Sequence, residues 1–208
     1  PPARNLHGMA YDSELDQVVL FGGETLPGSH IALGDTWIFS DDSWAQVPPE
    51  DLDPSPSARI AHAMAYHPGV GKTVLFGGVT PIPNHWWAGT PLGDTWAFED
   101  NEWSLVLAAD EDGISAPLPR LHPTMVYADN LGGVVLFGGW FILGQDREGD
   151  DCGNGTLASG FWGQCYFGDT WLFDGASWHK LVEDDPLGLD APTPRTSTAI
   201  AYDDTEGK

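Results

Sequence analysis

The sequence predicts an all-β fold, in which a unit of four short antiparallel strands is written three times. An apolar run closed by two glycines marks each unit, and its phenylalanines are Phe21, Phe76 and Phe137. The motif GDTW follows each run, and its acidic residues are Asp35, Asp94 and Asp169. An arginine seven residues before a tyrosine precedes each run, at Arg4, Arg59, Arg120 and, in a fourth partial copy, Arg195.

Each unit reads as four strands in chain order. In the first unit, residues 7–12 end at an acidic turn, and residues 17–23 form a continuous apolar run typical of a buried strand. Residues 35–40 alternate with large aromatics, and residues 43–48 end in proline, which suits an outer edge strand. Gly, Pro, Asp and Asn separate these runs, and no segment shows the period of a helix.

A repeated four-stranded unit predicts a β-propeller, whose blades are sheets of this kind set around an axis. The whole chain, residues 1–208, is then one propeller segment. Its blades are expected at about 4–48, 59–107 and 120–182, and the first strand of a fourth blade at about 195–203.

The glycine pair after an apolar strand, followed by a spaced aromatic and a later tryptophan, resembles the kelch repeat. GDTW combined with DGASW is similar to the kelch-type propellers of bacterial and galactose-oxidase-like proteins. This resemblance implies a closed ring of about six or seven blades. Three blades and one strand would leave sheet edges exposed. We therefore expect the remaining blades of a larger propeller, or a self-associated copy of this chain, to complete the ring.

Residues that recur in every unit are expected to serve the fold. The tryptophans of GDTW are predicted to pack between neighbouring blades, and they are Trp37, Trp96 and Trp171. Each repeat arginine is predicted to bind loop carbonyls or the repeat aspartate, because a buried charge persists only when it is paired. His7 and His62 share one repeat position. They are expected to be structural rather than metal ligands, since no carboxylate or cysteine lies nearby in sequence.

The charge limits the partners. The chain has 8 basic and 31 acidic residues, for a formal net charge of -23. Nucleic acid and insertion into a membrane are not expected, because phosphate binding needs a basic patch and no long apolar run is present. The acidity fits an extracellular protein kept soluble by its charge, a salt-rich habitat, or a chain that binds cations or basic partners.

The two cysteines, Cys152 and Cys165, lie in one segment without metal-ligand spacing. A disulfide closing this loop is expected, which would place the protein in an oxidising, extracellular or cell-surface compartment. Two free thiols in a cytosolic protein are the alternative.

Function is expected on the long loops, which all fall on one face if the strands are antiparallel. Aromatic side chains there suit stacking on sugar rings or anchoring a protein partner, or else they cap the core. The predicted ligand-binding residues are His85, Trp86, Trp87, Trp140, Phe141, Phe161, Trp162 and Tyr166. Four acidic loop residues form a weak calcium candidate, and they are Asp146, Glu148, Asp150 and Asp151.

These observations favour a non-catalytic binding or scaffold module that recognises a glycan or a protein. The resemblance to galactose oxidase would imply instead a copper enzyme with a tyrosine linked to a cysteine. Here both cysteines share one loop, and no serine-hydrolase, zinc-protease or phosphate-loop motif is present. A structural part of an extracellular surface assembly is the third possibility.

Overall fold

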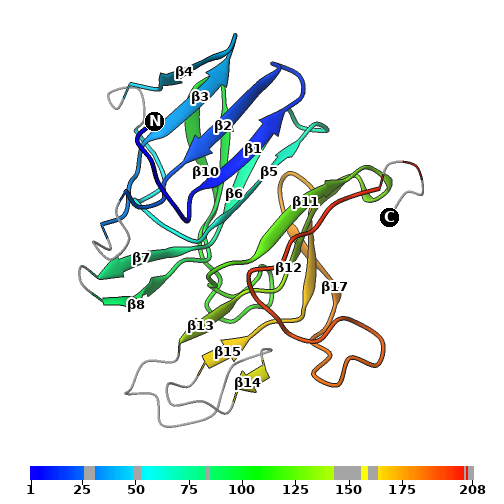
Figure 1. The fold of residues 1–208 in the computed structure, drawn as a ribbon. Helices are drawn as coiled ribbons and strands as arrows, with labels where there is room; N and C mark the ends of the chain where they lie inside the picture. Colours follow the sequence, from blue (N-terminus) through cyan, green and yellow to red (C-terminus); the bar gives the residue numbers. More distant parts are fainter. Residues whose placement is uncertain are drawn as a thin grey trace.

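The computed structural model describes residues 1–25, 31–48, 53–82, 85–142, 156–158, 164–203 and 205. Three four-stranded antiparallel sheets form the framework of this part of the chain (Figure 1). Sheet I contains β1 (Gly8–Asp12), β2 (Gln17–Phe21), β3 (Thr36–Ser40) and β4 (Ser43–Gln46). Sheet II contains β5 (Ala63–His67), β6 (Lys72–Phe76), β9 (Thr95–Glu99) and β10 (Glu102–Leu107). Sheet III contains β11 (Thr124–Ala128), β12 (Gly133–Phe137), β16 (Thr170–Phe173) and β17 (Trp178–Val182).

Within each sheet the strands lie in chain order, from an inner first strand to an outer fourth strand. The second strands end at their phenylalanines, two residues earlier than the sequence predicts. The reason is the glycine pair: Gly22 and Gly23 have φ angles of 65° and 92°, which turn the chain out of the sheet. A Cβ at Gly22 would also lie 2.7 Å from the carbonyl oxygen of Arg59, so glycine is required there.

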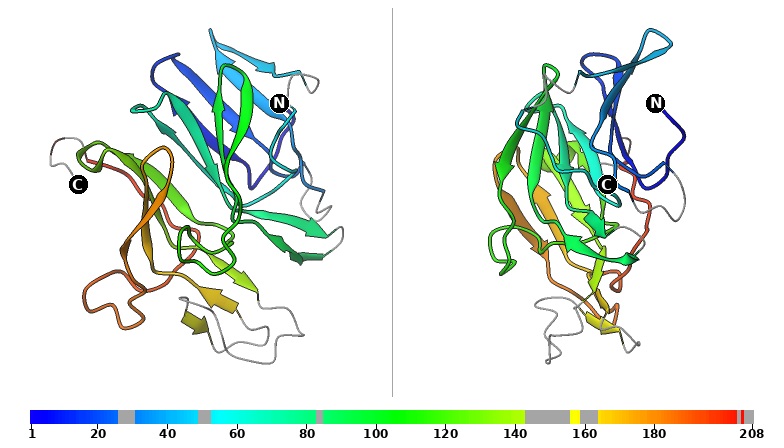
Figure 2. Two further views of the ribbon diagram at one scale, coloured as in Figure 1. Left: turned by 180° about the vertical axis from the view of Figure 1, so that it is seen from behind. Right: turned by 90° about the vertical axis from the view of Figure 1, so that its left-hand side faces the viewer.

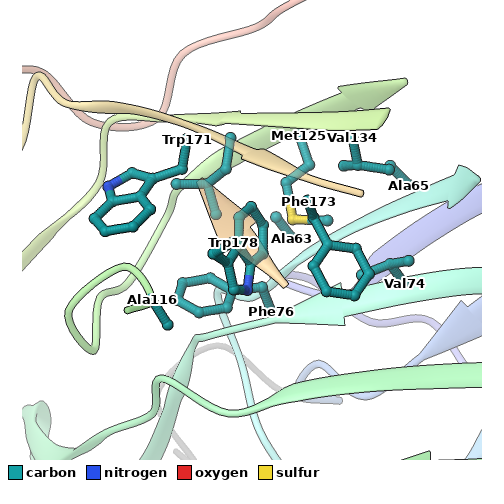
Figure 3. Packing of buried hydrophobic residues seen from close by; sticks show 11 residues of the cluster. Ala63, Ala65, Val74, Phe76, Ala116, Met125, Val134, Trp171, Phe173 and Trp178 are labelled. Atoms are coloured by element: carbon teal, nitrogen blue, oxygen red, sulfur yellow. The ribbon is translucent and has the colours of Figure 1, made fainter. Parts of the chain in front are cut away.

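The inner strands β1, β5 and β11 lie side by side, and the three sheets fan out from them (Figures 1 and 2). One buried cluster fills the space between sheets I and II, and another fills the space between sheets II and III. In the second cluster Trp178 of β17 packs edge-on against Phe76 of β6, with ring centroids 5.3 Å apart (Figure 3). The ring nitrogen of Trp178 donates to the Thr95 hydroxyl at 2.9 Å, which joins sheet III to sheet II.

The same link joins sheets I and II. The ring of Trp103 contacts Phe21, and its nitrogen donates to the Thr36 hydroxyl at 2.9 Å. Trp44 holds the same position in sheet I, but it is 37% exposed and its ring contacts Phe39 of its own sheet. The fourth-strand tryptophans of sheets II and III thus each reach the sheet that precedes theirs in the chain.

Two segments differ from the sequence-based expectation. Part of the predicted long loops forms small sheets, namely β7 (Val79–Ile82) with β8 (His85–Pro91), and β13 (Trp140–Ile142) with β15 (Gln164–Tyr166) and β14 (Thr156–Ala158). Their β-branched and aromatic residues favour strands. Residues 195–203, predicted as the first strand of a fourth blade, are not a strand. No neighbouring strand among the described residues supplies the hydrogen bonds that would make them one.

Helical structure in the described part of the chain is confined to one short turn, η2 (Asp129–Leu131). None of it is long and apolar enough to cross a membrane.

Candidate functional site

Three clusters of arginine, aspartate and tryptophan tie the strand ends together. In the most buried cluster Arg120 binds both carboxylate oxygens of Asp169, at 2.5 and 3.0 Å. Trp171 donates its ring N–H to the same carboxylate at 2.7 Å. Two equivalent clusters are Arg4, Asp35 and Trp37, and Arg59, Asp94 and Trp96.

Every side-chain nitrogen of these arginines donates at least one hydrogen bond. Arg120 also donates to the carbonyls of Leu118 and Gly138. Burial opposes the charge on Asp169, but the charge and hydrogen bonds of Arg120 hold the pKa of Asp169 below its ordinary value. A carboxylate that is fully paired in this way has no free proton acceptor for catalysis, so we assign the clusters to the fold.

Arg195 lies in the same backbone setting. Its carbonyl accepts from Gly139, as the Arg59 and Arg120 carbonyls accept from Gly23 and Gly78. Its side chain is exposed, however, and donates only to the carbonyl and hydroxyl oxygens of Thr193 among the described residues.

The repeat histidines do not form a metal site in the part of the chain that the structure describes. That part contains no group of three or more His, Cys, Asp or Glu placed to hold a metal. His62 is 6% exposed, and both of its ring nitrogens lack a hydrogen-bond partner. Burial, followed by the charges of Arg59 and His7, lowers the pKa of His62 to about 3, so the ring is neutral and belongs to the core.

The small sheet of β13, β15 and β14 brings together two of the predicted ligand-binding residues. Trp140 and Tyr166 are directly opposite each other on β13 and β15. Their rings are nearly parallel, with centroids 6.4 Å apart and an angle of 22°, and both residues are partly exposed. Two parallel rings on neighbouring strands form a flat aromatic surface, which is suited to stacking on a sugar or to a partner side chain.

Phe141 points to the opposite side of this sheet. Its ring stacks on Phe167 at 5.6 Å, and Phe167 in turn lies under the guanidinium of Arg120 at 3.9 Å. Phe141 therefore covers the buried arginine cluster. Alternation along a strand sends neighbouring residues to opposite faces, so this division could have been read from the sequence had β13 been recognised as a strand.

Several predicted residues cannot be placed. Of His85, Trp86 and Trp87 only the backbone is described, as part of β8. The remaining aromatic candidates, the acidic calcium candidates and the first cysteine lie outside the described residues, and they are Phe161, Trp162, Asp146, Glu148, Asp150, Asp151 and Cys152. The ligand and calcium assignments for these residues stay predictions.

Cys165 is buried on β15, and its pairing with Cys152 also stays a prediction. We expect unfolded, unreduced protein to take up no iodoacetamide, and reduced protein to take up two labels by mass spectrometry. Two labels without reductant would show that both thiols are free.

The inner strands form a concave surface that sequence reasoning missed. A cavity of about 730 Å³ runs along β1, β5 and β11. The tyrosines of all four repeat positions line it, and they are Tyr11, Tyr66, Tyr127 and Tyr202. The sequence contains a signal for this surface, namely the tyrosine that recurs at one repeat position. Residues at the same position of adjacent first strands lie side by side at one end of those strands. The small sheet of β13, β15 and β14, which carries Trp140 and Tyr166, lies apart from these tyrosines in the fold (Figure 1).

No protein-family model and no curated protein matches the chain. Among solved structures, the chain is similar to one described as the structure of YjhT, with a TM-score of 0.56 and 16% sequence identity. The match covers 88% of this chain and 53% of that one, so this chain spans about half of its length. At this identity the similarity concerns the fold alone.

Proposed function

We propose that sheets I, II and III are consecutive blades of a kelch-type β-propeller. The repeated links between sheets support this. Each glycine pair binds the carbonyl of the next repeat arginine, and the fourth-strand tryptophans of sheets II and III each bind a threonine of the preceding sheet. Neighbouring sheets are thus related by one repeated contact, as blades around an axis are.

The end surfaces support a ring with further blades. Trp44 has no preceding sheet to reach in the described part of the chain, and Arg195 has no carboxylate. A further blade with the repeat aspartate would supply that carboxylate. A self-associated copy of this chain is the alternative source of the missing partners.

We further propose that the protein is a non-catalytic binding module, extracellular or at the cell surface, which recognises a glycan or a protein. The observation that carries this proposal is the partly exposed pair of Trp140 and Tyr166. A propeller enzyme of the galactose-oxidase type, and a structural role in a surface assembly, remain the alternatives.

We expect Trp140→Ala to weaken binding to a glycan-array or protein ligand by about tenfold or more, because one stacked ring is lost from the surface. Trp44→Ala is the matched control, since it removes a partly exposed tryptophan elsewhere. The circular dichroism spectrum should be unchanged in both. Equal binding by the two variants would contradict the assignment of the aromatic pair.

A further inference from the structure

A second, smaller pocket lies between sheets I and II, at the turns that follow the first and third strands. Its volume is about 260 Å³. The turn between β1 and β2 forms one wall, and the turn between β9 and β10 forms the other. The turn between β1 and β2 lies at the far end of the fold from β13 and β15 (Figure 1), so this pocket is separate from the aromatic pair.

Four carboxylates line this pocket, from Asp12, Glu14, Glu99 and Asp100, and none of the described lining residues is basic. One of the four, Glu99, already forms an ion pair with the ammonium group of Lys72 at 3.0 Å. Carboxylates gathered on low-dielectric walls create a strong local negative potential. Acidic clusters are common on a chain of this charge, so the carboxylates alone do not define a binding site.

Tyr66 closes the pocket from sheet II. The residue is 7% exposed, and its hydroxyl faces the carboxylates of Asp12 and Glu14 without a hydrogen bond of standard geometry to either. Burial, followed by the neighbouring charge of Asp12, raises the pKa of Tyr66, so the hydroxyl stays neutral. A buried hydroxyl without such a bond is costly, and its oxygen can accept a hydrogen bond from a cation held by the carboxylates.

The equivalent space between sheets II and III is filled. There Val70 packs against Gly175, where a Cβ would lie 2.6 Å from Val70 Cγ1. His67 stands at the position of Asp12, and the residue matching Gly175 in sheet II is Asp100. The acidic pocket is therefore not a consequence of the repeat. Asp12 and Asp100 line it between sheets I and II, whereas His67 and Gly175 stand at their positions between sheets II and III.

We infer that this pocket binds one basic side chain, an arginine guanidinium or a lysine ammonium, presented by a protein partner. The volume of the pocket suits a single side chain. Its carboxylates supply charge-assisted hydrogen-bond acceptors, and the Tyr66 hydroxyl adds a neutral acceptor. The net charge of -23 would speed the approach of a basic partner. The inference does not depend on the aromatic pair or on a glycan ligand.

Nuclear magnetic resonance titration with acetyl-Gly-Arg-Gly-amide tests it, with the lysine peptide as a second probe and the citrulline peptide as the neutral control. We expect saturable shifts around Tyr66 and Asn101 with the basic peptides and none with citrulline. Glu14→Gln and Tyr66→Phe should each weaken binding by about fivefold, as expected when one acceptor is lost. Whichever basic peptide binds more tightly identifies the preferred head group.

Asp41→Asn is the matched control, because Asp41 holds in sheet I the position that Asp100 holds in sheet II and the charge change is the same. It should leave the affinity unchanged. An equal loss for Asp41→Asn and Glu14→Gln would show general attraction to an acidic surface and overturn the inference. So would citrulline binding, shifts that map elsewhere, or no shifts at millimolar peptide.

Discussion

Replacing Arg120 by alanine should lower the free energy of unfolding by about 3 to 5 kcal/mol, the usual cost of removing one partner from a buried ion pair. The Arg120 side chain is fully buried, and that of Asp169 is 2% exposed. Without the guanidinium, Asp169 would keep only the Trp171 N–H and would carry a charge away from water. Phe167, which lies under the guanidinium, would also lose its contact.

Arg195→Ala is the control for this prediction. It removes the same side chain from the same repeat position, but Arg195 is exposed and forms no ion pair in the described structure. Its loss should cost less than about 1 kcal/mol. Urea unfolding followed by circular dichroism measures both values. Similar losses for the two variants would show that the ion pair contributes little.

Should Arg120→Ala fail to fold, Arg120→Lys provides the graded test. Lysine keeps the charge but cannot bind both carboxylate oxygens in the fork geometry of arginine. We expect it to be destabilised, though less than the alanine variant. Full stability of the lysine variant would mean that charge alone, without the bidentate geometry, holds the cluster.

The sequence predicts the parts of this fold that recur in every unit, and it does not predict the parts that occur once. The strands of the three sheets were predictable because their apolar runs and turns recur in register. The hairpin of β7 and β8 was not, because Pro81 and the long connection read as a loop although the chain pairs there. Residues 195–203 show the converse: the pattern of a first strand is present, but a strand needs a hydrogen-bonded neighbour.

The candidate sites were less predictable than the strands, because they arise from contacts between sheets. Trp140 and Tyr166 were both expected to bind a ligand, but their pairing depends on the register of β13 and β15. The acidic pocket brings Glu14 close to Asp100, two residues that no sequence motif connects. Such pairs become visible only once the sheets are packed.

The stability of the protein should fall as the pH is lowered below 6.5, by up to about 1.4 kcal/mol per pH unit for a single titrating histidine. His62 is the main cause, because burial, the charge of Arg59 and the neighbouring His7 lower its folded pKa to about 3. Between these values the unfolded chain binds a proton on His62 and the native chain does not. The contribution is complete above pH 6.5 and is lost progressively as the pH falls toward 3.

The His62→Phe variant isolates this effect, since phenylalanine keeps a flat ring beside Phe21 and Met64 but does not titrate. Burial also lowers the pKa values of His7, His67 and His122, so the wild-type slope alone does not assign the effect to His62. The difference in slope between the two proteins does, because the other histidines are common to both. Urea unfolding from pH 7.5 to 5 should give a flatter dependence for His62→Phe, and parallel curves would mean that protonated His62 finds water or a hydrogen-bond acceptor in the native state.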